Sequence, residues 1–208
     1  MQSTKQVMEQ PPTVAYRLHG NCYLNTTWHC TLRCRFCPKF NGSREVQGYN
    51  LWLQSEPDTD QILAAVGDPA DYNEIVFCGY GEPTLRLEVL LQVAGALKQQ
   101  GARIRVNTDG LANLVHGYDV TSRLVQVVDA VSISLNAHEE RLYDYHCRPK
   151  RHGAFRALQN FARCASQHGM AVTLTAIDGL EEVSIPACEK IASELGMQFR
   201  ARQLNQVG

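Results

Sequence analysis

Short apolar runs alternate with stretches of helical periodicity along nearly the whole chain. The runs are rich in β-branched or aromatic residues and are bounded by glycine or polar residues, a pattern that predicts strands. The predicted strands cover residues 23–28, 74–78, 103–107, 130–135, 172–177 and 198–202. Between them, apolar residues recur at intervals of three and four, as on the buried face of a helix.

The predicted helices are amphipathic, and several have recognisable ends. Their apolar residues are Ile62 and Val66; Leu87, Leu90, Leu91, Ala94 and Leu97; Leu124, Val125 and Val128; Phe155, Leu158, Phe161, Ala162 and Ala165; and Cys188, Ile191, Ala192 and Leu195. Gly101, Gly169 and Gly196 follow the last turn of three of them, where glycine suits a left-handed residue. Ser184 and Pro186 fit the first turn of the last helix. Strands separated by helices predict a parallel sheet with right-handed crossovers.

The length of the chain narrows the choice of α/β architecture. An eight-unit barrel typically needs about 250 residues, and this chain has 208. We therefore expect an open, partial (β/α)6 barrel in a single domain. A flat, doubly wound sheet has the same alternation and stays as the alternative. Residues 1–14 are expected to form a polar N-terminal tail and residues 15–208 the core domain.

Composition and charge argue against several classes of protein. The formal net charge is −1, whereas a sequence-independent nucleic-acid binder usually carries a basic face. No apolar run has the length of a membrane span, and residues 1–12 lack the apolar centre of a signal peptide. The eight cysteines are therefore expected to be thiols or metal ligands of a cytoplasmic protein rather than disulfides.

Three of the cysteines lie within eight residues, directly after the first predicted strand. Cys30, Cys34 and Cys37 have the spacing of a short loop that curls around one iron–sulfur cluster. Three protein ligands leave the fourth iron of a [4Fe–4S] cluster open. Zinc is the alternative, but structural zinc sites usually have four protein ligands in two spaced pairs. The other cysteines form no CxxC pair, so the spacing favours the cluster.

Polar and glycine-rich segments follow the other strands at the same end. Residues 79–84 follow the second strand, residues 107–110 follow the third, and Ser134 and Asn136 close the fourth. In parallel α/β folds, chemistry gathers at the carboxyl ends of the strands. We expect these segments and the cysteine loop to form one site.

The CxxxCxxC spacing, with Phe36 before the last cysteine, resembles the signature of the radical S-adenosylmethionine (SAM) superfamily. The segments YLNTT (23–27), CPK (37–39), FCGYGEPT (77–84), VNTDG (106–110) and SISLN (132–136) are similar to those of TatD-associated radical SAM proteins. The resemblance runs from about residue 16 to residue 202. It implies a [4Fe–4S] cluster whose open iron chelates SAM, reductive cleavage to a 5′-deoxyadenosyl radical, and a one-electron donor such as flavodoxin or ferredoxin. It names no substrate.

The resemblance also implies which residues hold SAM. They are Phe36, Gly79, Tyr80, Gly81, Glu82, Pro83, Asn107, Ser134, Asn136, Arg148 and Ile177. Residues 80–83 stand where the superfamily has Gly-Gly-Glu-Pro, which binds the SAM amino group, and Tyr80 replaces the first glycine. Ser134 and Asn136, two apart and so on one face of the strand, are placed to bond the ribose. Arg148 would pair with the SAM carboxylate.

Most of these assignments have a structural alternative. Ser134 and Asn136 also fit ordinary capping of a strand end. Arg148 also fits a solvated basic loop. Phe36 and Ile177 are the candidates for the adenine, and Phe36 also suits a core position. The superfamily's adenine motif is not recognisable in residues 172–179, where Ile177 is the best candidate. Trp52 either shields the site or packs in the core.

The alternation within strands suggests a polar cavity. Strands covered on both faces should be continuous apolar runs, but Arg105 alternates with apolar residues, as does Arg200. No obvious carboxylate on these strands accompanies either arginine, and a buried arginine is costly unless paired. We expect one or both to face the open barrel and bind an anionic or carbonyl-rich substrate. Alternatively, they cover the outer edge of the sheet and pair with a helix.

Two other functions remain open from the sequence. A short radical SAM chain also fits an activase that places a glycyl radical on a partner protein. A zinc-stabilised interaction domain without catalytic activity would leave the Gly-Glu-Pro turn and Ser134 without a role.

Overall fold

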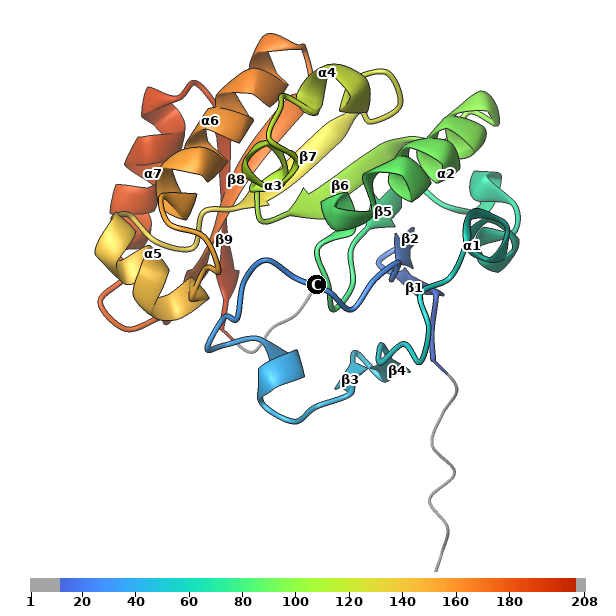
Figure 1. Ribbon diagram of the computed structural model, residues 1–208, viewed down its shortest axis with the longest axis horizontal. Coiled ribbons are helices and arrows are strands. Elements are labelled where there is room, and N and C mark those ends of the chain that lie inside the picture. The colour runs from blue at the N-terminus through green and yellow to red at the C-terminus, as the bar shows by residue number, and fades with distance from the viewer. Residues whose placement is uncertain (1–11, 205–208) are drawn as a thin grey trace, which may run out of the picture.

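The computed structural model describes residues 12–204, and its main sheet has seven strands (Figure 1). Their order is β1-β2-β5-β6-β7-β8-β9, and only β1 is antiparallel to its neighbour. The strands are β1 Ala15–Leu18, β2 Asn21–Leu24, β5 Ile75–Phe77, β6 Ile104–Thr108, β7 Ala130–Ser134, β8 Ala171–Asp178 and β9 Gln198–Gln203. The six predicted strands are confirmed, although β2 ends at Leu24. The side chain of Asn25 donates to the carbonyls of Thr13 and Leu51 there, and the chain leaves the sheet.

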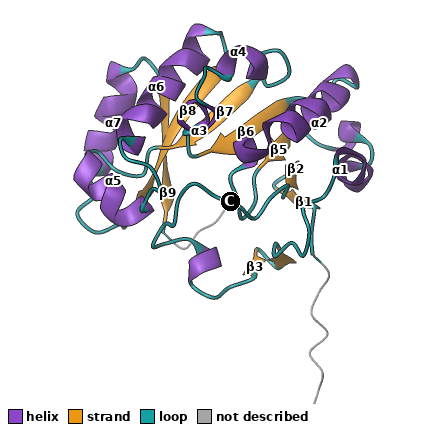
Figure 2. Cartoon of the chain, in the orientation of Figure 1, coloured by secondary structure: helices purple, strands orange, loops and turns teal. Residues whose placement is uncertain are grey.

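The helices lie around the outside of the strands, as Figure 2 shows. They are α1 Thr59–Val66, α2 Leu87–Gln99, α3 Ala112–His116, α4 Thr121–Leu124, α5 Glu140–Cys147, α6 Ala154–Gln167 and α7 Ile185–Glu194, with short 3₁₀ helices η1 Pro38–Phe40, η2 Pro69–Asp71 and η3 Pro83–Arg86. A two-stranded ribbon, β3 Glu45–Val46 and β4 Tyr49–Asn50, completes the fold. The apolar pattern does not predict α3 and α5, and α4 stops before Val125 and Val128.

The predicted helix ends are confirmed. Gly101, Gly169 and Gly196 have φ of 85°, 92° and 69°, in the left-handed region where a side chain is strained. Ser184 caps α7, because its side-chain oxygen accepts from the backbone N–H of Ala187.

The two faces of the sheet differ in character. Leu24, Phe77, Val106, Ile133 and Leu174 belong to one core that the helices cover. The register places the alternate residues together on the other, inner face, because paired residues of parallel strands point to the same side. They include Arg105, Asn107, Ser132, Ser134, Thr175, Ile177, Arg200 and Arg202.

The sheet is therefore an open, partial barrel, as predicted. A doubly wound sheet carries helices on both faces, whereas here a small cluster without helices lies on the inner face. Its members are Tyr16, Tyr23, Val46, Leu51, Val76 and Tyr80. Strands β1 and β9 form the two edges of the sheet. Within the described residues, no helix has the length and apolar character needed to span a membrane.

Candidate functional site

The cysteine loop lies between β2 and η1, at the carboxyl ends of the parallel strands. Cys30, Cys34 and Cys37 are all half-buried. Backbone hydrogen bonds from Arg33 to the Cys147 carbonyl, 3.0 Å, and from Arg35 to the His146 carbonyl, 2.8 Å, tie the loop to the last turn of α5. This helix, which the apolar pattern misses, therefore positions the loop.

The three thiols suit an iron–sulfur cluster by their chemistry. Burial raises the pKa of Cys30 and of Cys37, and a hydrogen bond with Cys147, followed by burial, raises that of Cys34, so these shifts do not themselves favour the thiolate form that binds iron. Among residues 12–204, no three His, Cys, Asp or Glu side chains converge at metal-binding distance. The fit rests on the donor set, because three soft thiolates on one short loop match an iron–sulfur cluster and leave one iron open.

Cys147 is a neighbour of the loop that sequence reasoning missed. It is fully buried at the end of α5, and its thiol contacts that of Cys34. The side-chain amide of Asn136 donates to its sulfur at 3.7 Å. Cys147 has no local motif and lies far from the loop in sequence, so only the tertiary fold reveals the contact.

The glycines of the segment 79–83 allow backbone to pack on backbone. A Cβ on Gly81 would lie 2.4 Å from the carbonyl oxygens of both Thr27 and His29, and one on Gly79 would lie 2.2 Å from Oδ1 of Asn25. The N–H of Glu82 donates to the His29 carbonyl at 2.8 Å. The turn implied to bind SAM is therefore fixed to the residues that precede Cys30.

Tyr80, which replaces a glycine of the superfamily pattern, packs on the inner face of the sheet. Its buried ring packs in the inner cluster, and its hydroxyl donates to the Ser43 carbonyl at 2.6 Å. Its N–H points to Oδ1 of Asn25 at 3.3 Å. The side chain thus joins the turn to the segment leading to β3 and leaves Gly81 free to touch the cysteine loop.

Glu82 joins two strand ends rather than pointing outward. Its carboxylate, in a side chain 4 % exposed, accepts from the N–H and hydroxyl of Thr84, the hydroxyl of Thr108 and the N–H of Asp109. Asp109 in turn accepts from the N–H of Leu111 and from the hydroxyl of Thr31 in the cysteine loop. Pro83 begins η3 directly after Glu82 and is buried.

This carboxyl pair should make stability depend on pH. Burial raises the pKa of Glu82 above its usual 4.5, although its hydrogen bonds oppose the shift. Burial and the charge of Glu82 raise the pKa of Asp109 well above 3.8. Raised folded pKa values mean that the stabilisation is complete below the unfolded values and is lost as pH rises through the folded ones. Urea unfolding of the cluster-free chain should show stability falling above about pH 4, and Asp109→Asn should flatten the fall; an unchanged slope would contradict the coupling.

Ser134 and Asn136 do not share a strand face, which corrects the sequence-based expectation. Ser134 is the last residue of β7 and is half-buried on the inner face. The chain then turns, and Asn136 has a φ of 56° outside the strand. The side-chain oxygen of Asn136 accepts from Nη2 of Arg202 at 3.5 Å. The alternation of side chains between the two faces of the sheet therefore ends at Ser134.

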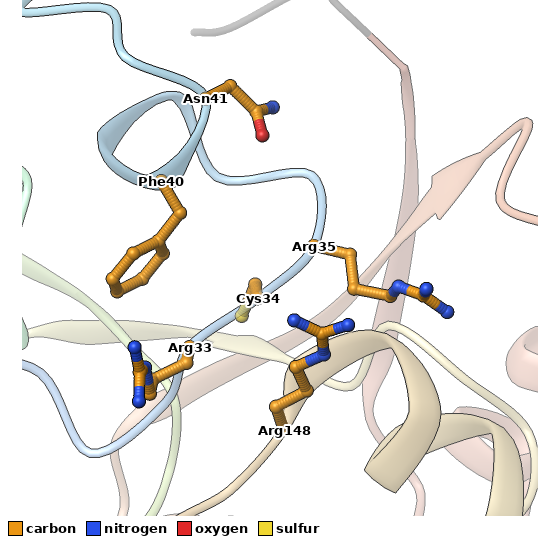
Figure 3. A pocket seen from close by; sticks show the side chains of 6 residues that line it. All are labelled: Arg33, Cys34, Arg35, Phe40, Asn41 and Arg148. Carbon is orange, nitrogen blue, oxygen red and sulfur yellow. The ribbon is translucent and has the colours of Figure 1, made fainter.

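Arg148 closes α5 in the left-handed conformation, with φ of 47°, and its side chain is exposed. It borders a cavity of about 330 Å³ that also touches Cys34. Figure 3 shows the guanidinium group of Arg148 beside Cys34, whereas the side chain of Arg33 extends away from it. The remaining lining residues are Arg35, Phe40 and Asn41. The geometry brings Arg148 to the cysteine loop.

A second cavity of about 330 Å³ lies against Cys30. Trp28 and Trp52 line it with ring centroids 5.6 Å apart in an edge-on arrangement. Trp52 therefore borders the site rather than lying in the main core. Both cavities carry cationic side chains, because Arg33 lines both and Lys39 and Lys150 line the second, and the second adds the two tryptophans.

The remaining SAM candidates occupy different surroundings. Phe36 is partly buried against the main core, which agrees with its alternative structural role. Ile177 is buried on the inner face of β8, beside Arg202 in register. Asn107 is half-buried on the inner face, and its side chain accepts from Arg105.

The expectation that Arg105 lacks a carboxylate is wrong. Its Nε donates to Glu74 at 2.7 Å, because Glu74 lies just before β5 on the adjacent strand. Arg200 is exposed on the inner face, and no carboxylate in residues 12–204 pairs with it. Arg202, which sequence reasoning left out of the site, lies two residues further on the same face. Because Arg202 lies two residues after Arg200, the alternation of the strand could have placed both arginines on the same face.

Comparison with known proteins identifies the family. The model of the radical SAM superfamily matches residues 24–195, from the last residue of β2 to just beyond α7. Comparison with curated protein sequences gives no match. The family match covers the cysteine loop, the 79–83 turn and the ends of β6, β7 and β8.

Solved structures share the fold at low identity. TYW1 with a lysine–pyruvate adduct bound has a TM-score of 0.62 and 12 % identity, over 91 % of this chain and 66 % of that chain. SuiB of Streptococcus suis, bound to its precursor peptide SuiA, has a TM-score of 0.64 and 13 % identity, over 86 % and 38 %. Methylornithine synthase (PylB) has 0.61 and 15 %, over 88 % and 53 %.

The chain spans between 38 % and 66 % of the length of these three proteins. Their TM-scores show a common fold, and the family match covers most of the chain. The chain thus belongs to the radical SAM superfamily, whose members are enzymes that use a [4Fe–4S] cluster and SAM.

Proposed function

We propose that this chain cleaves SAM reductively at a [4Fe–4S] cluster held by Cys30, Cys34 and Cys37. The observation that carries the proposal is the packing of the turn at residues 79–83 on the cysteine loop, through the 2.8 Å hydrogen bond from Glu82 to His29. Metal ligands and the SAM turn then form one rigid unit. Fixed placement of the reacting groups is what a protein contributes to cofactor chemistry.

Each residue of the proposed site has a task set by its position. The guanidinium of Arg148, beside Cys34, pairs with the SAM carboxylate. Ser134 bonds the ribose, since the amide of Asn136 is engaged by Cys147 and Arg202. When bound, the cluster supplies one electron that splits SAM into methionine and a 5′-deoxyadenosyl radical, which takes a hydrogen atom from the substrate.

The rest of the site shapes the SAM pocket. Phe36 and Ile177 contact the adenine. Gly79, Gly81 and Pro83 fix the turn that receives the SAM amino group, and Asn107 lines the inner face. Trp28 and Trp52 exclude water beside the cluster, because their rings line the adjoining cavity.

The test is product formation by the reconstituted, chemically reduced chain without oxygen. We expect 5′-deoxyadenosine from SAM. Arg148→Ala should weaken SAM binding by about tenfold, the scale of a charged hydrogen bond, with the iron content unchanged. Arg151→Ala is the matched control, because Arg151 is exposed in the same loop and its side chain reaches the carbonyl of Leu114, away from Cys34. Bound SAM that gives only methylated products would show a different chemistry.

The same features support a proposal for the subfamily, the electron donor and the cellular location of the enzyme. The segments at 23–27, 77–84, 106–110 and 132–136 support a TatD-associated radical SAM protein. The exposed side chains of Arg33 and Arg35, on either side of Cys34 in the sequence, suit an acidic electron donor such as flavodoxin or ferredoxin. All eight cysteines are free thiols, which supports a cytoplasmic location.

A further inference from the structure

Among the charged side chains of the inner face within residues 12–204, Arg202 has a buried donor atom that lacks a hydrogen-bond partner. Its Nε is buried and has no hydrogen-bond partner. Its Nη2 donates a long hydrogen bond, 3.5 Å, to Oδ1 of Asn136. A buried donor without a partner lowers stability, and it does so more when it is charged. Such a group is retained at a cost in stability.

No carboxylate within residues 12–204 neutralises the positive charge of Arg202. Arg200 lies on the same face of β9, paired in register with Thr175 as Arg202 is with Ile177. The groups that act on Arg202 are this second arginine and the thiols of Cys78 and Cys34. Burial lowers the pKa of Arg202, and no carboxylate of the described chain offsets that effect. Arg105 differs, because Glu74 neutralises it.

The position of Arg202 connects it to the reacting centre. Asn136 holds Nη2 of Arg202 on one side and the sulfur of Cys147 on the other, and Cys147 contacts Cys34. Arg148 borders a different surface, the cavity beside Cys34 that Arg202 does not line. Arg148 and Arg202 are therefore available to two different anions.

We propose that Arg202, assisted by Arg200, binds a carboxylate or phosphate group of the substrate on the inner face of the barrel. The planar edge formed by Nε and Nη2 matches two oxygens of such a group. An anion there completes the hydrogen bonding of Nε and neutralises the pair of arginines. This assignment rests on the proposed function, because the substrate that gives up a hydrogen atom must lie beside SAM. It identifies the substrate as a molecule with an anionic oxygen group, a carboxylate or a phosphate.

The test is anion binding by the full chain with its cluster reconstituted, measured by isothermal titration calorimetry. The probes are malonate and inorganic phosphate, with malonamide as the uncharged control. We expect at least one anion to bind, malonamide not to bind, and Arg202→Gln to weaken the anion at least tenfold. The preferred probe separates a carboxylate from a phosphate substrate. Arg163→Gln removes the same charge from the exposed side of α6 and should bind like the wild type.

Arg200→Gln provides a second variant whose folding is not in question, because Arg200 is exposed. It should weaken the same anion by about threefold, as loss of a flanking charge does. Equal anion binding by wild type and Arg202→Gln would overturn the proposal, as would anion binding that only Arg163→Gln reduces. Loss of SAM binding in Arg202→Gln would also overturn it, since the arginine would then serve SAM. Failure of the proposed function is a separate result, because it appears as absent 5′-deoxyadenosine in the wild type.

Discussion

Alanine at any one of Cys30, Cys34 and Cys37 should abolish the iron–sulfur cluster. The wild-type chain, reconstituted without oxygen, is expected to hold about four irons and four sulfides with a brown, reducible chromophore. Each variant loses one of three thiolates on a single short loop, and two thiolates cannot hold the cubane. Iron and sulfide analysis, with electron paramagnetic resonance after reduction, measures the effect.

Cys147 provides the matched control for this experiment. Its thiol touches that of Cys34, but it is buried at the end of a helix and bonded to Asn136. Cys147→Ser should therefore retain iron and sulfide at the wild-type level. Stoichiometric zinc without sulfide, lost on removal of Cys147 as well as of the loop cysteines, would instead show a four-thiolate zinc site.

Alanine at Gly81 should damage both the fold and the cluster. The added Cβ would lie 2.4 Å from the carbonyl oxygens of Thr27 and His29, which are backbone atoms and cannot rotate away. The turn must then separate from the cysteine loop, breaking the hydrogen bond from Glu82 to His29. We expect a loss of about 3 kcal/mol of stability, a midpoint of thermal unfolding lowered by roughly 10 °C, and reduced iron content.

Gly95 in α2 is the control for the same chemical change. A Cβ there would meet only Cγ1 of Val127, at 3.6 Å, an ordinary contact. Because glycine is unfavourable inside a helix, Gly95→Ala should stabilise the chain by about 0.5–1 kcal/mol. Equal effects of the two substitutions on thermal unfolding would refute the account of Gly81.

The elements that local sequence determines were predictable. Strand positions, the glycine ends at Gly101, Gly169 and Gly196, and the cap at Ser184 depend on residues close in sequence, and the structure confirms them. The open barrel followed from chain length and the alternation of elements. Helix α5 was missed, because it is only eight residues long and charged residues interrupt its apolar positions.

Contacts between distant segments were not predictable. The carboxylate of Glu74 reaches Arg105 across neighbouring strands, and Cys147 reaches Cys34 from a separate helix. No pattern within either segment marks these pairs. The period of two also failed at Asn136, because the chain leaves β7 after Ser134 and turns into the left-handed region.

The hydrogen bonds among three loops form a closed ring. His29 accepts from Glu82, Glu82 accepts from the N–H of Asp109, and Asp109 accepts from Thr31, two residues after His29. A change in one loop therefore alters the geometry of the other two. Among related sequences, substitutions in one of these three segments should therefore be accompanied by compensating substitutions in the other two. The exposed residues of α2 and α6 carry no such constraint and should diverge independently of the ring.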